Sequence, residues 1–321
     1  FLWPKFLFSK NIYNINNVYN YEKALLDEEF NKLSCFRKEN IIEPLDACFH
    51  FNGTDYDIVE EIYGNKVNKD YLYAYILNSV LIGRKIIDLE EINAYEYPDF
   101  TSTSEKVIDA QKELNKYVST EIYYTFDEEI EILDGSIINE WLEVDQSMNV
   151  VFNEKKIKEY LNELSSKYDT YGKTRSFKTT TGKTIDVVGG NYGWKIDKSK
   201  EFEELMENIK GGEKIKKKPV YIQEAWGTRE NDIGNTYVEI NLTNQCLWFY
   251  KEGKLIVQGD VVTGNISRGN ATPQGTYILN YKQKNATLKG AGYSSDVKYW
   301  MPFNCNIGIH DASWRNSFGG N

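Results

Sequence analysis

The sequence predicts a multidomain α+β protein in which two repeated α+β modules precede a β-rich domain. Its 321 residues exceed a single ordinary core, because a domain takes about 150 residues. One stretch of chain recurs at an offset of 129 residues, and closely spaced strands begin near residue 235. Apolar residues make up 41% and charged residues 27% of the chain, values that exclude a collagen-like or disordered protein.

The internal repeat aligns residues 51–83 with residues 180–212 without a gap. Each copy contains a glycine-centred turn, a short strand, a Tyr-Gly turn and then a helix. Asn68 and Asp197 suit the N-cap positions of the two helices, and Gly83 and the Gly211-Gly212 pair suit their ends. The sequence therefore predicts a duplicated module with one strand-turn-helix core.

Further periodic segments complete the two modules, which we place at residues 1–112 and 113–222. Residues 120–126 alternate as a strand does, and residues 154–167 carry apolar side chains on one helical face. The repeated helices do the same, with Leu72, Tyr75, Ile76 and Val80 in the first copy and Phe202, Leu205, Met206 and Ile209 in the second. Two charge runs, residues 127–131 and 214–218, are interpreted as solvated surface.

The charge balance argues against a nucleic-acid binder. The chain has 38 basic and 48 acidic residues, whereas phosphate recognition needs a basic footprint. Residues 237–321 carry a net charge of +3 and residues 1–236 carry −13, so the C-terminal part suits an anionic partner. No stretch reaches the roughly 18 to 20 apolar residues of a membrane helix. We expect any membrane anchor or signal peptide to lie outside this chain.

The cysteines and histidines predict neither a metal site nor a cofactor. Cys35, Cys48, Cys246 and Cys305 form no CxxC motif, and His50 and His310 are the only imidazoles. Cys35 and Cys48 could pair in an oxidising compartment, but we favour four buried, small apolar side chains. His50, between Phe49 and Phe51 on a predicted strand, is interpreted as structural.

The β-rich domain, residues 235–321, carries the candidate chemistry. Val238, Ile240 and Leu242 alternate, as do Cys246, Trp248 and Tyr250, and residues 251–254 close a hairpin. Thr272-Pro273-Gln274-Gly275 has the signature of a type I turn. His310 ends an apolar strand and precedes a polar turn, where an imidazole suits a general base, although a core histidine is the alternative.

The order of these features resembles the L,D-transpeptidase family with its YkuD-type catalytic domain. The resemblance covers residues 237–321 and rests on Val261-Val262-Thr263-Gly264, the Thr-Pro-x-Gly segment, Trp300-Met301-Pro302-Phe303 and His310-Asp311-x-x-Trp314. Residues 1–222 resemble the tandem peptidoglycan-binding modules that precede this domain in some low-GC Gram-positive members. Tyr192-Gly193-Trp194-Lys195-Ile196-Asp197 is the most recognisable piece of these modules.

The resemblance implies a cysteine acyl transfer on peptidoglycan stem peptides outside the cell, at the wall or facing it from a membrane anchor. His310 matches the base that deprotonates the thiol, and Asp311 matches the residue whose backbone carbonyl orients the imidazole. The thiolate would attack the bond between the third residue of a tetrapeptide stem and its terminal D-Ala, and an amine from a second stem would complete a 3,3 cross-link. Trp300, Met301, Phe303 and Trp314 are candidate pocket walls, although core packing is as good an interpretation for Met301 and Phe303.

The family nucleophile is a cysteine in a Ser/Thr-His-Gly-Cys motif that follows the strand-end histidine. The sequence ends at Asn321, eleven residues after His310, and neither Cys305 nor Cys246 occupies the motif position. We therefore expect an incomplete domain whose nucleophile lies just beyond Asn321, and a chain that is inactive as written. A wall-binding protein without chemistry and an L,D-carboxypeptidase that hydrolyses the same bond are the alternatives, and anionic wall polymers are candidate partners of the cationic domain.

Overall fold

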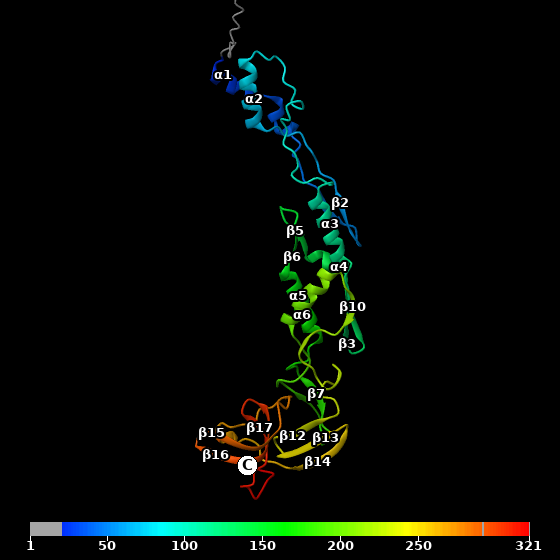
Figure 1. The fold of residues 1–321 in the computed structure, drawn as a ribbon. Helices are drawn as coiled ribbons and strands as arrows, with labels where there is room; N and C mark the ends of the chain where they lie inside the picture. Colours follow the sequence, from blue (N-terminus) through cyan, green and yellow to red (C-terminus); the bar gives the residue numbers. More distant parts are fainter. Residues whose placement is uncertain (1–20, 291, 321) are drawn as a thin grey trace, which may run out of the picture. The chain divides into compact units, whose positions relative to one another are not determined.

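The computed structural model describes residues 21–290 and 292–320. The chain divides into two compact units, Phe1–Asn115 with Glu143–Val151, and Lys116–Leu142 with Phe152–Asn321 (Figure 1). Helices and strands are mixed throughout, and the last part of the chain is built of strands. The fold is therefore α+β with a β-rich C-terminal part, as predicted, while the exact boundaries of the three expected domains stay a prediction. Among the described residues, no helix has the length and apolar character needed to cross a membrane.

The first unit is built of helices and short strand pairs. Its elements are α1 (Lys23–Asn31), η2 (Ser34–Phe36), η3 (Lys38–Asn40), β1 (Cys48–Phe51), β2 (Tyr56–Val59), α2 (Lys69–Leu81) and most of α3 (Glu105–Val118). β1 and β2 pair antiparallel. A small core of Phe30, Val67, Leu72, Ile92 and Ala94 is buried between α1, α2 and the following loop, and the Phe30 ring meets those of Phe36 and Tyr73 edge-on at 5.0 Å.

The second unit begins with a three-stranded sheet covered by two helices. β3 (Glu121–Phe126) is central, with β10 (Lys214–Lys217) parallel on one side and β4 (Glu129–Leu133) antiparallel on the other. Every second residue of β3 is buried, as are the apolar residues on the inner faces of α5 (Glu154–Tyr168) and α6 (Lys198–Gly211). The predicted strand and both predicted helices are therefore confirmed. The remaining elements of this part are α4 (Gly135–Ile138), η4 (Asn139–Trp141), β7 (Arg175–Lys178), β8 (Thr184–Val187), β9 (Lys195–Ile196) and β11 (Tyr221–Gln223), whereas β5 (Leu142–Val144) and β6 (Val150–Phe152) pair with each other and lie mostly in the first unit.

The predicted duplication is confirmed in the order and capping of its elements. A hairpin, β1–β2 or β7–β8, comes first in each copy, and a capped helix, α2 or α6, follows. The Asn68 side chain accepts from the Tyr71 N–H, and the Asp197 side chain accepts from the Lys200 N–H three residues into the second helix. A glycine with positive φ follows each helix: Gly83 at +73°, one residue after the C-cap Ile82 of α2, and Gly212 at +70°, the C-cap of α6.

In the charge run at residues 214–218, the interpretation as solvated surface was wrong for Lys217, whose side chain is 15% exposed, whereas the other lysines of the run are exposed. Lys217 Nζ lies 3.0 Å from Glu201 Oε1 and 2.7 Å from Glu204 Oε2. Glu201 is fully buried and also accepts from the Tyr124 hydroxyl at 2.6 Å and the Val220 N–H at 2.6 Å. A carboxylate on the inner face of α6 thus recruits a lysine from the neighbouring β10, because a buried charge requires a partner. In the other run, Glu131 pairs with Lys167 and Asp127 with Arg229.

The β-rich part of the second unit consists of two three-stranded antiparallel sheets. β12 (Tyr237–Asn241), β13 (Cys246–Lys251) and β14 (Lys254–Asp260) form the first; β15 (Gln283–Gly290), β16 (Tyr293–Asn304) and β17 (Ile307–His310) form the second, with η5 (Ile266–Arg268) between them. The predicted hairpin at residues 251–254 is confirmed, with Glu252 and Gly253 at positive φ. Residues 272–275 form no hydrogen-bonded turn, contrary to the prediction, and instead bend at Gly275, whose φ is +136°.

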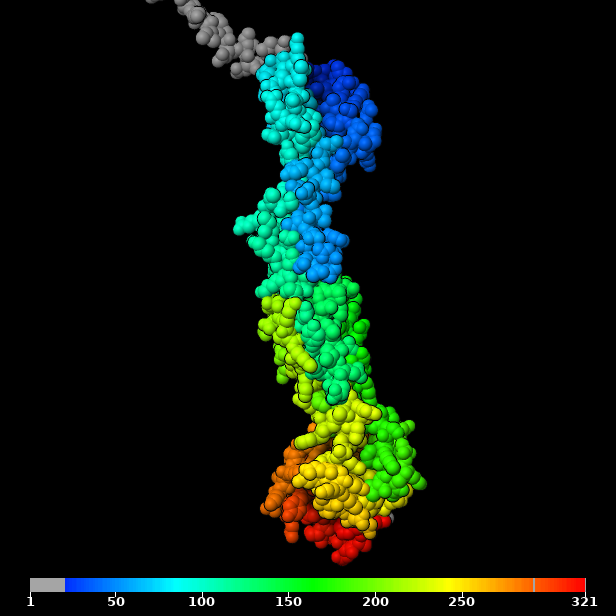
Figure 2. Space-filling model, turned by 90° about the vertical axis from the view of Figure 1, so that its right-hand side faces the viewer, coloured from blue at the N-terminus to red at the C-terminus, as the bar shows by residue number. Residues whose placement is uncertain are grey.

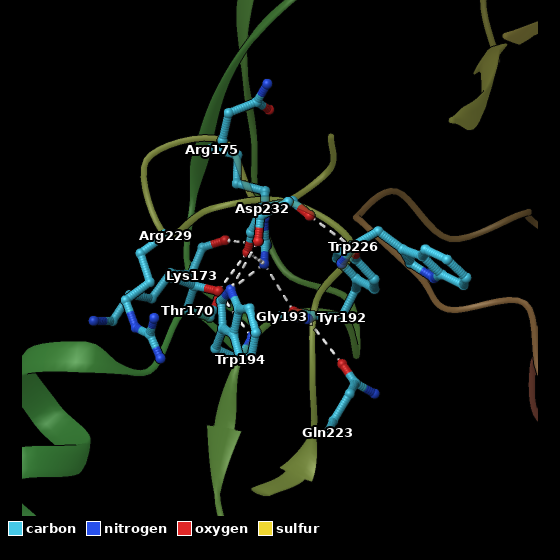
Figure 3. Close-up of polar contacts among 12 residues, drawn as sticks. Thr170, Lys173, Arg175, Tyr192, Gly193, Trp194, Gln223, Trp226, Arg229 and Asp232 are labelled. Atoms are coloured by element: carbon cyan, nitrogen blue, oxygen red, sulfur yellow. Dashed lines mark hydrogen bonds and ion pairs between the residues drawn. The ribbon is translucent and has the colours of Figure 1, made fainter. Parts of the chain in front are cut away.

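A buried ion pair fixes the segment that enters the β-rich part (Figure 3). Arg175 donates from Nε to Asp232 Oδ1 and from Nη2 to Asp232 Oδ2, both at 2.7 Å, and the two side chains are only 9% and 5% exposed. Arg175 Nη2 also donates to the backbone oxygens of Thr170 and Tyr192. The Tyr192 hydroxyl in turn donates to the backbone oxygen of Asp232 at 2.8 Å. The linker before β12 is therefore held by the same module that precedes it.

Candidate functional site

His310 lies at the end of β17 with an exposed side chain, and this exposure separates it from a core histidine. Its Nδ1 is 2.8 Å from the backbone oxygen of Asp311. Because a carbonyl oxygen can only accept, Nδ1 carries the hydrogen in this contact, which leaves the lone pair of the neutral ring on Nε2. The imidazole is thus oriented by its own chain, with its basic nitrogen on the side away from Asp311.

Two indoles flank the imidazole. The β16–β17 register sets Trp300 directly opposite His310, and their ring centroids are 6.0 Å apart at 45°. The Trp314 ring lies 6.0 Å from the imidazole at 29°, in a stacked arrangement, and is 52% exposed, whereas Trp300 is 9% exposed. A side chain on Gly308 would meet the Trp300 indole at 2.8 Å, so the glycine leaves the space that this indole occupies. The two indoles and the exposed His310 imidazole therefore lie together at one end of the β15–β16–β17 sheet.

Met301 and Phe303 lie farther along β16. Met301 pairs with Ile309, and since neighbouring residues of a strand point to opposite faces, it lies on the face opposite to Trp300. The Phe303 ring packs against Tyr277 at 5.3 Å. Within residues 21–290 and 292–320, neither side chain forms a ring contact or hydrogen bond with His310. The structure thus groups His310, Asp311, Trp300 and Trp314, and places Phe303 at a second wall with Tyr277.

The Asp311 carboxylate has a contact that sequence reasoning missed. Its Oδ1 accepts from the Tyr299 N–H at 2.8 Å, so the residue that orients His310 through its backbone also ties the loop to β16 through its side chain. This hydrogen bond lowers the pKa of the Asp311 carboxyl below its ordinary value. We call this bond between the Asp311 carboxylate and the Tyr299 N–H the Asp311 clamp. Its only signal in the sequence was an aspartate directly after a strand-end histidine.

We expect this clamp to weaken in acid. The carboxyl's pKa is lower in the folded state, so the stabilising bond is complete above the ordinary aspartate pKa and is lost as the pH falls through the lowered one. The Tyr299 amide resonance should follow the same titration, measured by NMR. Asp311→Asn keeps an acceptor oxygen and should abolish the transition, whereas a midpoint at or above the ordinary aspartate pKa would contradict the assignment.

The cysteines do not supply a partner for His310. All four are free, none is fully buried, and Cys48 and Cys305 are exposed, so the interpretation of four buried side chains was wrong. Cys305 lies in the β16–β17 turn, and His310 is three residues beyond Ile307, the first paired residue after that turn. At about 3.3 Å per strand residue, Ile307 is already roughly 10 Å from His310 along β17, and Cys305 lies beyond Ile307 in the turn. Cys246 lies on β13 in the other sheet.

No group of three or more metal-ligating side chains occurs among the residues that the structure describes. His50 is on β1, as predicted, with an exposed side chain that pairs across the hairpin with Asp57. It belongs to the first unit, whereas His310 belongs to the second. The candidate site therefore consists of protein groups at the end of β16 and β17.

Comparison with known families and structures covers nearly the whole chain. The family model described as a peptidoglycan binding domain matches residues 5–88 and 100–216, and the model of the L,D-transpeptidase catalytic domain matches residues 235–321. A crystal structure of a cysteine-to-serine mutant of the Enterococcus faecium L,D-transpeptidase is 31% identical, covers 65% of this chain and 84% of its own, and has a TM-score of 0.51.

A second structure, the Ldtfm-avibactam carbamoyl enzyme, is 30% identical, with 67% of this chain and 85% of that chain covered and a TM-score of 0.52. A comparison with curated proteins gave no match. Each match covers about two thirds of this chain, which is more than residues 235–321 alone, so the likeness extends beyond the β-rich domain.

Proposed function

The chain belongs to the L,D-transpeptidase family, with peptidoglycan-binding modules ahead of a YkuD-type catalytic domain, and from this premise we propose that it forms 3,3 cross-links between stem peptides through a cysteine acyl-enzyme. The observation that carries the proposal is the exposed His310 imidazole with Nδ1 bound to the Asp311 carbonyl. This arrangement leaves Nε2 as a proton acceptor, which a thiol nucleophile needs.

The chemistry follows from the properties of a thiol. With a pKa of about 8.5, a cysteine is mostly protonated near neutral pH, so a base must take its proton. We assign this role to His310 Nε2. The thiolate then attacks the carbonyl that joins the third stem residue to D-Ala, a thioester forms, and D-Ala leaves with the proton from the imidazolium. The amine of a second stem attacks the thioester, which releases the thiol and completes the cross-link.

The nucleophile belongs, in this proposal, to the segment that follows Asn321. This placement is supported by the position of Cys305 in the β16–β17 turn, at the far end of β17 from His310, and by the position of Cys246 in the other sheet. Trp300 and Trp314 form the wall beside the imidazole. Phe303, packed against Tyr277, extends the pocket along β16, whereas Met301, on the face opposite to Trp300, suits the alternative of core packing.

The partners and location follow from the same proposal. The modules bind peptidoglycan, and the enzyme works outside the cell, at the wall or anchored in the membrane through a segment outside this chain. The net charge of +3 on residues 237–321 suits contact with anionic wall polymers.

The test is acylation by a carbapenem, followed by intact mass spectrometry. We expect no adduct on residues 1–321 and a stoichiometric adduct on a chain that continues past Asn321, because only the latter supplies the thiol. An adduct on Cys305 or Cys246 would show that the nucleophile was misplaced. With stem peptides, a cross-linked dimer indicates a transpeptidase, a shortened stem indicates an L,D-carboxypeptidase, and no turnover in the longer chain indicates a wall-binding protein.

A further inference from the structure

The second module makes direct backbone contact with the β-rich domain at a pair of glycines. The Thr276 N–H donates to the Gly189 oxygen at 3.1 Å, and the Asn191 N–H donates to the Thr276 oxygen at 3.0 Å. These bonds form a parallel bridge between Gly190 and Thr276. All of these residues belong to the second compact unit. The module therefore pairs with the catalytic domain as one strand pairs with another.

The two backbones can come this close only because glycines stand on both sides of the contact, one in the module and one in the β-rich domain. A Cβ on Gly190 would lie 1.9 Å from the Thr276 oxygen, and one on Gly275 would lie 2.8 Å from the Gly190 nitrogen. The φ angles of Gly190 and Gly275 are +98° and +136°, which L-residues with side chains adopt at a cost. The glycine of the Thr-Pro-x-Gly segment thus serves as a contact surface for the module.

Asn191 extends the contact with its side chain. Its Oδ1 accepts from the Ile278 N–H at 3.2 Å, and its Nδ2 lies 3.5 Å from the Phe303 oxygen, the limit of a hydrogen bond. Gln223 holds this segment from within the module. Its side chain donates to the backbone oxygen of Asn191 at 3.2 Å. It also accepts from the Gly193 N–H at 2.8 Å (Figure 3). Asn191 is thereby fixed by its own module while it binds two segments of the catalytic domain.

The two segments that Asn191 binds support the wall at Phe303. Ile278 follows Tyr277, whose ring lies 5.3 Å from the Phe303 ring. Phe303 is on β16, three residues after Trp300, the neighbour of His310. A displacement of Asn191 would therefore change the positions of Tyr277 and Phe303 more than that of the imidazole, because Asp311 holds His310 separately.

A second, independent anchor keeps the module on the domain. The Thr180 N–H and hydroxyl both donate to the carboxylate of Glu239, at 3.0 and 2.6 Å to Oε2, and Glu239 is only 9% exposed. The Phe177 ring packs edge-on against Tyr237 at 5.5 Å. Figure 2 shows the green surface of the β7–β8 hairpin lying directly against the yellow surface of the β-rich domain.

We propose that the second peptidoglycan-binding module supports one wall of the stem-peptide pocket, with Asn191 as a positioning residue for Tyr277 and Phe303. The inference rests on the proposed function, because that function places Phe303 in the pocket. It adds that substrate affinity depends on a residue outside the catalytic domain.

The test compares Asn191→Ala and Asn191→Asp with Asn65→Ala. Asn65 makes the same pair of side-chain bonds to backbone, with Ile42 and Asn40, but in the first module. In residues 1–321, hydrogen exchange at the Ile278 amide should accelerate roughly fivefold in Asn191→Ala, as expected for one lost hydrogen bond. Asn191→Asp keeps the acceptor and should stay near wild type, and Asn65→Ala should leave Ile278 unchanged.

Kinetics on the chain that continues past Asn321 supply the second measurement. In Asn191→Ala, the carbapenem concentration that gives half-maximal acylation should rise several-fold, while the maximal acylation rate stays within about twofold. Unchanged Ile278 exchange in folded Asn191→Ala, or an equal change in Asn65→Ala, would overturn the inference. If no acylation occurs in any variant, the proposed function fails, while the exchange measurement still decides whether Asn191 holds the wall.

Discussion

His310→Gln, in a chain that continues past Asn321, should slow acylation by a carbapenem about 10²- to 10⁴-fold, the usual contribution of a general base. Glutamine has a similar length and can still contact the Asp311 carbonyl, but it cannot take a proton from the thiol. The few per cent of thiolate present without a base sets the residual rate. The measurement is the pseudo-first-order rate of adduct formation, by intact mass or by loss of carbapenem absorbance.

The matched control is Asp311→Asn. It keeps the backbone oxygen that orients His310 and an acceptor for the Tyr299 N–H, so acylation should slow far less than in His310→Gln. Thermal melting of both variants checks that they are folded. An unchanged acylation rate in folded His310→Gln would rule out the base assignment, and equal losses in the two variants would point to a positional effect instead.

Asp232→Ala should destabilise the second unit by about 3–5 kcal/mol, the effect of removing one partner of a buried ion pair. Arg175 is 9% exposed, so the variant leaves its charge buried with only the carbonyls of Thr170, Lys173 and Tyr192 as acceptors. Denaturant unfolding, followed by tryptophan fluorescence, measures the loss.

An exposed pair provides the comparison. Lys158 and Glu154 on α5 lie 2.7 Å apart, but their side chains are 58% and 60% exposed, so Glu154→Ala should cost at most about 1 kcal/mol. The double variant Arg175→Met with Asp232→Leu should recover part of the stability lost in Asp232→Ala, because no uncompensated charge remains. Equal, small effects of Asp232→Ala and Glu154→Ala would show that the buried pair does not hold the linker.

The sequence predicted those elements whose signals are local. The caps at Asn68 and Asp197 lie three residues from the amides that they accept from, and the Glu252-Gly253 turn is contained in its own hairpin. Helix α3 was missed, although Val107, Ala110 and Leu114 are buried at helical spacing and could have revealed it. Contacts between distant residues had no such signal: Arg175 and Asp232 are 57 positions apart.

The same division applies to the site. A strand-end histidine is visible in the sequence, and the pairing of Trp300 with His310 follows once β16 and β17 form a hairpin. The burial of Glu239 could not be predicted from the alternation of Val238 and Ile240, because it depends on Thr180 in another module. Asn191 was missed for the same reason, since its partners Ile278 and Phe303 lie in the catalytic domain.

The docking glycines also distinguish the two copies of the repeat. At the offset of 129, Gly189 and Gly190 align with Glu60 and Glu61, while the turn glycines and helix caps around them are kept. A glutamate in place of Gly190 would clash with the Thr276 backbone, because even a Cβ at this position would lie 1.9 Å from the Thr276 oxygen. The two copies thus share one scaffold but differ at the residue pair that lets the second copy approach the catalytic domain at Thr276. The first copy carries side chains at both positions, so it cannot form the backbone bridge that Gly190 makes with Thr276.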